Sequence, residues 1–319
     1  MKSLEEFRTS LKEKLVELHW KQWSTLGISS HVEETKHIID LEALIVSSLL
    51  IGNYDKRLLA SSLEWIKKNK EWVGASRIKQ IGKHFTKKDK QLKKSLIHKE
   101  LIEFVPVLLK DRAGGKGLEE ISEEAIPEDY KRVLLTLEDR NVTTAPVIQK
   151  YPLLQLYFRG IFGINARTEI FLYLLLEGKG NSNGIAREIY YDQKIVYRVL
   201  KRWAAAGFIR EETGKKETLY FLKSGRDLAG HIKPRGHYVD WCKVFYFFSR
   251  LLTFADTEPW AGDRYLLSSL FRDVSEYAGV FGRYFDILLP EGSLYEGEAF
   301  FPPFASAILQ LLDKINERK

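Results

Sequence analysis

Six polar or basic side chains recur near the middle of the chain at the spacing of one helix face. They are Gln193, Lys194, Tyr197, Arg198, Lys201 and Arg202. Four apolar residues form the opposite stripe: Val196, Val199, Leu200 and Trp203. This pattern predicts an amphipathic helix over 193–203. Basic side chains neutralise phosphates, and Gln, Lys and Arg also pair with base edges in the major groove. The stretch therefore has the residue types needed to bind and read duplex DNA.

Each residue of this predicted helix suits a particular contact with DNA. Gln193 has the amide that pairs with adenine, and Lys194 and Arg198 have the donors that pair with guanine. Tyr197 can pack on a thymine methyl group or donate a hydrogen bond to a phosphate. We therefore expect base readout from the first two turns of the helix.

Five basic residues suit contacts with the DNA backbone. Lys201 and Arg202 lie at the far end of the same predicted helix, and Arg187 lies on the helix before it. Lys215 and Lys216 lie in a predicted turn, from which they would reach a neighbouring phosphate or the minor groove. Such contacts add affinity and fix orientation without reading sequence.

The segment that must position these residues, 166–223, predicts three short helices followed by a hairpin. The first helix ends at Gly178, and Ser182 is the expected N-cap of the second. Asp192 is the expected N-cap of the third helix, where its carboxylate also suits the positive end of the helix dipole. Gly207 follows the third helix and supplies the positive φ that a helix end favours.

Two alternating stretches, 208–211 and 217–223, predict strands joined by a turn at 213–216. At this point IAREIYYDQKIVYRVLKRWAAAGFI, residues 185–209, resembles the winged helix-turn-helix of transcriptional regulators of the broad MarR and ArsR type. The resemblance covers 166–223 alone. It implies a DNA-binding module whose third helix enters the major groove.

The charge of the chain fits a polyanionic partner. Residues 165–226 hold twelve Lys and Arg against seven Asp and Glu, a net charge of +5, and the whole chain carries +7 with a pI near 9.1. Winged helices also serve as protein-interaction modules, however. Three acids in the predicted hairpin favour that alternative because they would face phosphates. They are Glu211, Glu212 and Glu217.

Composition places the chain among globular proteins. Its 45% hydrophobic and 13% aromatic residues can build cores, and its single cysteine, Cys242, excludes a disulfide framework within the chain. The start is a charged amphipathic helix rather than a signal peptide. The most apolar run, 241–254, is interrupted by Lys243 and Arg250, which favours a buried helix over a membrane span. We therefore expect a cytoplasmic protein with no membrane contact.

The pattern predicts a mainly α fold with three regions. A helical region, 1–110, is followed by a Gly- and acid-rich linker, 111–129, and by the winged helix-turn-helix region, 130–230. Within the first region, 67–99 holds twelve basic residues against two acids, which fits either a solvated helix face or a second phosphate-binding surface. Its predicted helices also allow a degenerate second helix-turn-helix, although no repeat supports duplication.

The last region, 231–319, is helical and rich in aromatic residues. Their spacing fits a core, and it also allows a dimer seam or a small-molecule site. Regulators of this kind commonly act as two-fold dimers, so we expect a homodimer. Pro302 and Pro303 are expected to begin the final helix rather than to interrupt it.

No motif for catalysis, for a cofactor or for a metal site is found. The histidines and Cys242 lack a standard zinc spacing, and GGKG at 114–117 lacks the spacing of a phosphate loop. The sequence therefore predicts a sequence-specific, dimeric DNA-binding regulator without enzymatic activity, with an effector ligand unsupported. Two alternatives stay open: an interaction adaptor or scaffold, and a non-catalytic DNA-binding subunit of a nucleic-acid-processing system.

Overall fold

The computed structural model describes residues 4–88, 142–223, 237–256, 264–275 and 278–316. These parts are mainly helical, with one small antiparallel sheet. The predicted linker and residues 89–99 of the basic stretch 67–99 lie outside the described residues. None of the described helices is long and apolar enough to cross a membrane.

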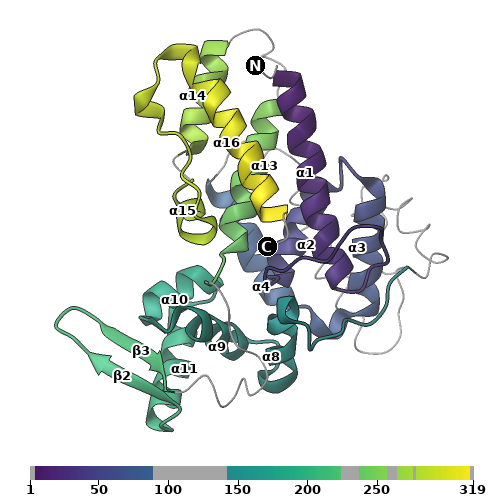
Figure 1. Ribbon diagram of the computed structural model, residues 1–319. Helices are drawn as coiled ribbons and strands as arrows, with labels where there is room; N and C mark the ends of the chain where they lie inside the picture. The colour runs from purple at the N-terminus through teal and green to yellow at the C-terminus, as the bar shows by residue number, and fades with distance from the viewer. Residues whose placement is uncertain (1–3, 89–141, 224–236, 257–263, 276–277, 317–319) are drawn as a thin grey trace.

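Helices from both ends of the chain pack together into one helical body (Figure 1). From the first part it contains α1 (Leu4–Thr25), α2 (Leu41–Ile51), α3 (Lys56–Lys68) and α4 (Ala75–Lys88). From the last part it contains α13 (Trp241–Asp256), α14 (Arg264–Ser275), α15 (Gly279–Phe285) and α16 (Phe301–Asn316). Figure 1 shows α16 and α13 lying beside α1.

The predicted boundaries at 110 and 231 imply that the two terminal regions form separate cores. In the structure these regions share one core. Phe7 of α1 packs its ring edge against Phe271 of α14 and Phe301 of α16, at centroid distances of 5.8 and 5.9 Å. The aromatic residues of the last region thus bury their surface against the first helices, which is where the hydrophobic gain is largest. The prediction of a core role for this aromatic stripe is confirmed.

A second group of elements lies below the helical body in Figure 1. We name residues 166–222 the α9–β3 unit; it comprises α9 (Ala166–Glu177), β1 (Lys179–Gly180), α10 (Ser182–Ile189), α11 (Gln193–Ala205), β2 (Ile209–Thr213) and β3 (Thr218–Leu222). The strands form an antiparallel sheet in the order β1-β3-β2, with Glu211 opposite Tyr220. Its own core is formed by inward residues of the three helices together with Ile209 and Tyr220.

Local signals in the sequence account for most boundaries of this unit. Asp192 caps α11 by accepting hydrogen bonds from the amides of Lys194 and Ile195, and Gly207 has φ +73°, both as predicted. The predicted N-cap of α10, Ser182, is wrong by one residue. Asn181 is the cap, since its side chain accepts from the amide of Gly184 at 2.6 Å. The two-residue strand β1 is too short to leave an alternating pattern.

The segment before the unit supports it from behind. A 3-10 turn, η6 (Tyr151–Leu153), leads into α8 (Leu154–Phe162), which packs on α9. Phe158 and Phe171 meet edge to face at 4.7 Å, and Phe162 lies 6.1 Å from Trp203 of α11. This segment therefore packs against α9 and α11.

Candidate nucleic-acid interface

Helix α11 turns its two stripes in opposite directions, as the sequence predicts. Val196 and Leu200 are fully buried in the core of the α9–β3 unit, and Val199 and Trp203 are half-buried. Five of the six predicted DNA contacts on this helix are exposed: Lys194, Tyr197, Arg198, Lys201 and Arg202. The burial of the inner stripe fixes how the helix is rotated, so the outer side chains face away from the core.

The cations on this outer face differ in what already holds them. The Lys201 ammonium pairs with Glu211 of β2 at 2.6 Å, and this hydrogen bond raises the pKa of Lys201. Among the described residues, no carboxylate pairs with Lys194, Arg198 or Arg202. Arg198 instead donates from Nε to the carbonyl of Lys194 at 3.3 Å. Three cations of α11 are therefore available to an incoming anion.

Gln193 is the exception among the predicted base contacts. It is half-buried, and its Nε2 donates to Ser182 Oγ at 3.0 Å, which ties the first turn of α11 to α10. Ser182, expected as a helix cap, accepts this bond instead. To pair with adenine, the amide of Gln193 would have to break its hydrogen bond to Ser182.

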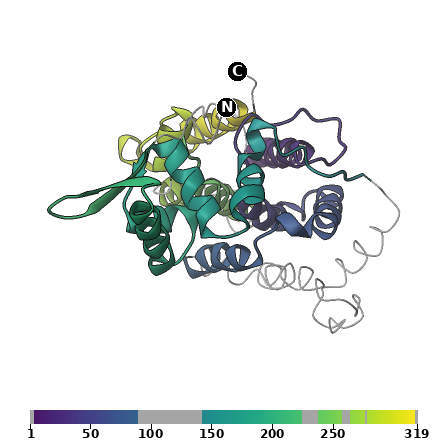
Figure 2. The ribbon, with the colours of Figure 1, turned by 90° about the horizontal axis from the view of Figure 1, so that it is seen from below.

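The hairpin β2–β3 projects beyond the rest of the molecule (Figure 2). Its strands pair from Ile209–Leu222 to Thr213–Thr218, and the turn closes with Gly214 donating to the carbonyl of Glu217 at 2.9 Å. Lys215 and Lys216 are exposed in this turn. The hairpin thus carries two cations away from the body of the protein, on the same unit as the exposed face of α11.

The acids of the hairpin are already engaged within the unit. Glu212 pairs with Arg210 at 3.0 Å, and Glu217 accepts a hydrogen bond from Asn181. With Glu211 held by Lys201, none of the three carboxylates is left without a partner. Because the three acids have partners, they repel phosphates less strongly. Arg187 of α10 is exposed on the same unit.

The basic stretch 67–99 does not form one uniform surface in its described part. Lys67, Lys79 and Lys83 are exposed, and Lys68 pairs with Glu64 at 2.6 Å. Arg77 is fully buried and belongs to an internal network of charges. The charge count of the stretch therefore overstates the positive charge that it presents to solvent.

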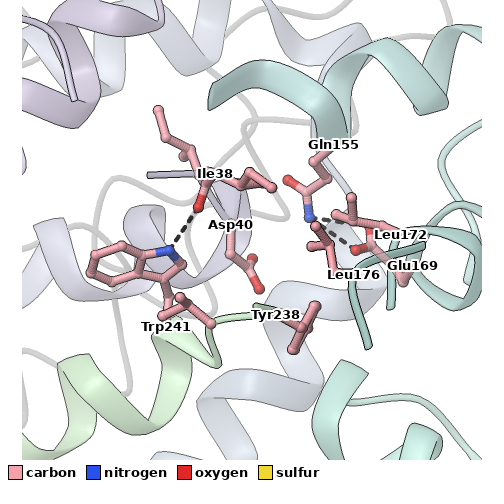
Figure 3. Close-up of a pocket in the computed structure, with 10 residues that line it drawn as sticks. Ile38, Asp40, Gln155, Glu169, Leu172, Leu176, Tyr238 and Trp241 are labelled. Carbon is pink, nitrogen blue, oxygen red and sulfur yellow. Dashed lines mark hydrogen bonds between the residues drawn. The ribbon is translucent and has the colours of Figure 1, made fainter. Parts of the chain in front are cut away.

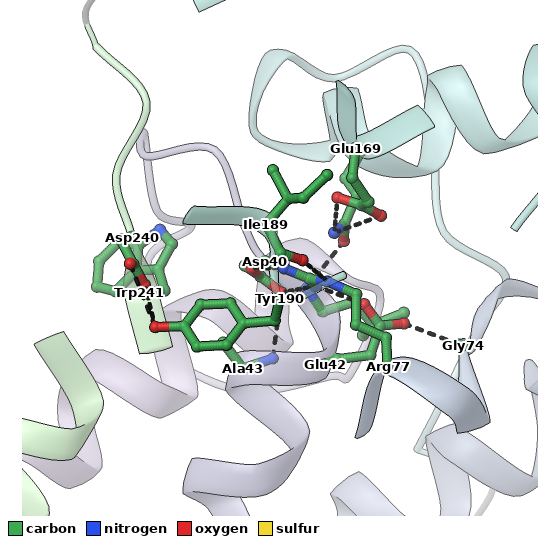
Figure 4. A network of polar contacts seen from close by, with 12 residues as sticks. Asp40, Glu42, Ala43, Gly74, Arg77, Glu169, Ile189, Tyr190, Asp240 and Trp241 are labelled. Atoms are coloured by element: carbon green, nitrogen blue, oxygen red, sulfur yellow. Dashed lines mark hydrogen bonds and ion pairs between the residues drawn. The ribbon is translucent and has the colours of Figure 1, made fainter. Parts of the chain in front are cut away.

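This buried charge network joins the helical body to the α9–β3 unit (Figure 4). We use the name for two arginines and three carboxylates: Asp40, Glu42, Arg77, Arg159 and Glu169. Arg77 of α4 donates to both oxygens of Asp40, at 2.5 and 2.6 Å, and to Glu42 at 2.8 Å. Its Nε donates to the carbonyl of Ile189 at 3.1 Å, where α10 ends.

The second arginine completes the link. Arg159 of α8 pairs with Glu42 of α2 at 2.6 Å and with Glu169 of α9 at 2.7 Å. Burial raises the pKa of Glu42, but the attraction of Arg159 and Arg77 outweighs it and lowers that pKa to about 2. The network is therefore charged at neutral pH. Buried and paired charges of this kind are costly to break, because each partner would be left unpaired.

A second polar contact holds the turn between α10 and α11. Tyr190 caps α10 with φ 60°, in the left-handed region that residues other than glycine rarely adopt. Its hydroxyl donates to Asp240, with O···O distances of 3.1 and 3.2 Å (Figure 4). Burial raises the pKa of Asp240 to about 6, against the attraction of Lys243. The turn that leads into α11 is thus fixed to the start of α13.

A small cavity lies beside the buried charge network (Figure 3). Its volume is about 20 Å³, close to that of a single water site. The polar groups that line it are engaged: Gln155 donates to both oxygens of Glu169, at 3.0 and 3.2 Å, and Trp241 donates to the carbonyl of Ile38 at 2.7 Å. A cavity of this size holds no organic substrate, so we assign it a packing role.

Sequence patterns did not indicate the buried charge network, because its five charged residues come from four separate segments with no common spacing. Comparison with models of protein families, with curated proteins and with solved structures finds no match.

Proposed function

We propose that the α9–β3 unit is a winged helix-turn-helix that binds duplex DNA. In this proposal α11 enters the major groove and the β2–β3 hairpin is the wing. The observation that carries it is the outer face of α11, which presents Lys194, Arg198 and Arg202 to solvent while its inner stripe is buried. Such a face supplies both phosphate neutralisation and donors for base edges.

The proposal divides the predicted contacts into two groups. Lys194, Tyr197 and Arg198 lie on the first turns of α11 and would meet base edges, as in helix-turn-helix proteins generally. The remaining predicted cations would hold the backbone: Arg187, Lys201, Arg202, Lys215 and Lys216. Lys201 would exchange Glu211 for a phosphate.

We further propose that the protein is a transcriptional regulator that acts as a homodimer in the cytoplasm, without catalytic activity of its own. A two-fold pair of α11 helices would read two half-sites about 34–36 Å apart along the DNA. Light scattering of the full chain, alone and with DNA, measures this stoichiometry. Two protein copies on one palindromic duplex support the proposal, and a single copy contradicts it.

Selection from a random duplex library, followed by mobility shift of the enriched sequence, tests DNA binding. An enriched motif supports the proposal, and its absence contradicts it. Two variants then separate the roles. Arg198→Ala should relax the preference at one base pair and cost about tenfold in affinity, whereas Lys216→Ala should weaken all sequences equally. Equal effects on every sequence from both variants would contradict base reading by α11.

One observation favours protein docking as the second candidate. Ile195 and Tyr197 of α11 are 40% and 44% exposed, and aromatic side chains on an accessible helix are common anchors in protein interfaces. An adaptor of this type would bind a protein partner through α11 and would show no salt-sensitive affinity for DNA. A DNA affinity that falls with salt therefore favours the first candidate over the second.

A further inference from the structure

A second cavity lies in the helical body, beside the Arg283–Glu177 contact with the α9–β3 unit. Its volume is about 670 Å³, within the range of sites that hold small organic ligands. Nine residues line it: Lys36, His37, His237, Gly282, Arg283, Tyr284, Phe285, Asp286 and Lys314. They come from the segment before α2, from the residues that precede α13, from α15 and its C-cap, and from α16.

The lining is predominantly cationic. Lys36, Arg283 and Lys314 each carry a positive charge, against one carboxylate from Asp286. Lys314 donates to the main-chain carbonyl of Asp286 at 3.1 Å, so its charge is not cancelled by that bond. Although Arg283 pairs with Glu177, cations still outnumber carboxylates around the cavity, which favours an anionic occupant.

Neutral groups complete the cavity wall. His37 donates from Nε2 to the carbonyl of Ile315 at 3.2 Å, and burial lowers its pKa, so the ring is neutral at pH 7. Its ring packs edge to face on Phe285 at 5.6 Å. Tyr284 lies beside the Arg283 guanidinium, 5.6 Å from it. The wall therefore combines cationic ends with aromatic surface, which suits a small organic anion.

Two of the lining residues also hold the α9–β3 unit. Arg283 pairs with Glu177, the last residue of α9, and the hydroxyl of Tyr284 lies 3.5 Å from Glu188 of α10. Glu177 in turn accepts a hydrogen bond from the amide of Tyr238 at 3.0 Å. An anion in the cavity would compete with Glu177 for Arg283. Occupancy would then change contacts on the two helices that precede α11.

We propose that this cavity binds a small organic dianion, either a phosphate ester or a polycarboxylate, and that binding changes the affinity of the α9–β3 unit for DNA. The first half of this proposal, anion binding, depends on the cavity alone. The second half, regulation of DNA affinity, rests on the proposed function. The two halves are tested separately.

Calorimetric titration of the full chain tests the binding half. The probes are ribose 5-phosphate for the phosphate class, succinate for the carboxylate class and ribose as the neutral control. We expect one of the two anions to bind and ribose not to bind. Lys314→Met should weaken binding about tenfold or more, the loss expected for one charge-assisted contact. Lys67→Met, which removes one exposed charge from α3, should leave it unchanged.

A second variant from another part of the wall, Lys36→Met, keeps the test independent of the folding of one variant. Thermal unfolding of each variant without anion shows whether it is folded. Failure of both anions to bind the unmodified protein overturns the binding half. Binding that is equally tight in folded Lys314→Met and Lys36→Met also overturns it.

Fluorescence anisotropy of labelled duplex, with and without the anion that binds, tests the regulatory half. We expect a change of severalfold in DNA affinity for the unmodified protein and none for Lys314→Met. An anion that binds but leaves DNA affinity unchanged overturns the coupling. Failure of the DNA-binding proposal gives a different result, namely no DNA complex under either condition while the calorimetric binding persists.

Discussion

The outer face of α11 and the buried charge network both use arginine, but in opposite surroundings. Arg198 lies in solvent and donates only to a carbonyl of its own helix, whereas Arg77 and Arg159 are buried and matched by three carboxylates. The buried arginines form ion pairs and hydrogen bonds that link α4 and α8 to the α9–β3 unit. The exposed arginine is accessible to an external anion. Burial and partners, rather than residue type, therefore separate structural from recognition cations in this molecule.

Removing one buried arginine should have the largest effect on stability. Arg159→Met leaves Glu42 and Glu169 without their main counter-charge, which should lower the free energy of unfolding by about 3–5 kcal/mol. Chemical denaturation at pH 7 measures this. The matched control, Arg198→Met, removes the same charge from the α11 face and should change stability by less than about 0.5 kcal/mol. Equal losses in the two variants would remove the distinction between the regions.

The pH dependence of stability should reveal the buried contact between Tyr190 and Asp240. The pKa of Asp240 is about 6 in the folded protein, against an ordinary value of 3.8, so the folded state binds more protons between these pH values. The contribution of this carboxyl to stability should thus fall as pH rises from about 4 to about 6, by roughly 3 kcal/mol.

Asp240→Asn removes this titration while keeping an acceptor for the Tyr190 hydroxyl. The unfolding free energy of the unmodified protein minus that of the variant should decrease over the same pH window. Denaturation at pH 4.5, 5.5 and 7 gives this difference. A difference that stays constant, or that grows with pH, would contradict the assignment.

The hairpin should show the smallest effect. Lys215→Ser with Lys216→Ser should leave the free energy of unfolding within about 0.5 kcal/mol, because both side chains are exposed. DNA affinity should fall by about tenfold, and the slope of log affinity against log salt should decrease by about two. Titrations at several salt concentrations measure both. An unchanged slope would mean that the hairpin does not reach phosphates.

Local signals predicted the helices and the hairpin of the α9–β3 unit well, because each is set by residues close in sequence, whereas β1 depends on pairing with the distant β3. The buried stripe of α11, the Asp192 cap and the positive φ of Gly207 all follow from spacing and residue type. The N-cap of α10 was missed by one residue, since Asn181 and Ser182 are both good caps and only geometry decides between them. The arrangement of the unit on DNA stays a prediction.

Long-range partners could not be predicted in the same way. Nothing in the spacing of Asp40, Arg77 and Glu169 indicates that they meet, because the contacts depend on how four segments pack. The same holds for the shared core of the terminal helices and for the cavity lined by α15, α16 and the segments before α2 and α13. Arg77 shows the consequence, since the sequence counts it in a basic stretch and the fold buries it.

The most direct test of the central claim measures the affinity of the selected duplex by fluorescence anisotropy for two charge-reversed proteins. Lys194→Glu with Arg198→Glu changes the α11 face, and Lys67→Glu with Lys79→Glu makes the same change in net charge on α3 and α4. We predict that the first pair weakens binding by about 100-fold or more and that the second has only a small effect. Equal losses from the two pairs, or no loss from the first, would contradict DNA recognition by α11.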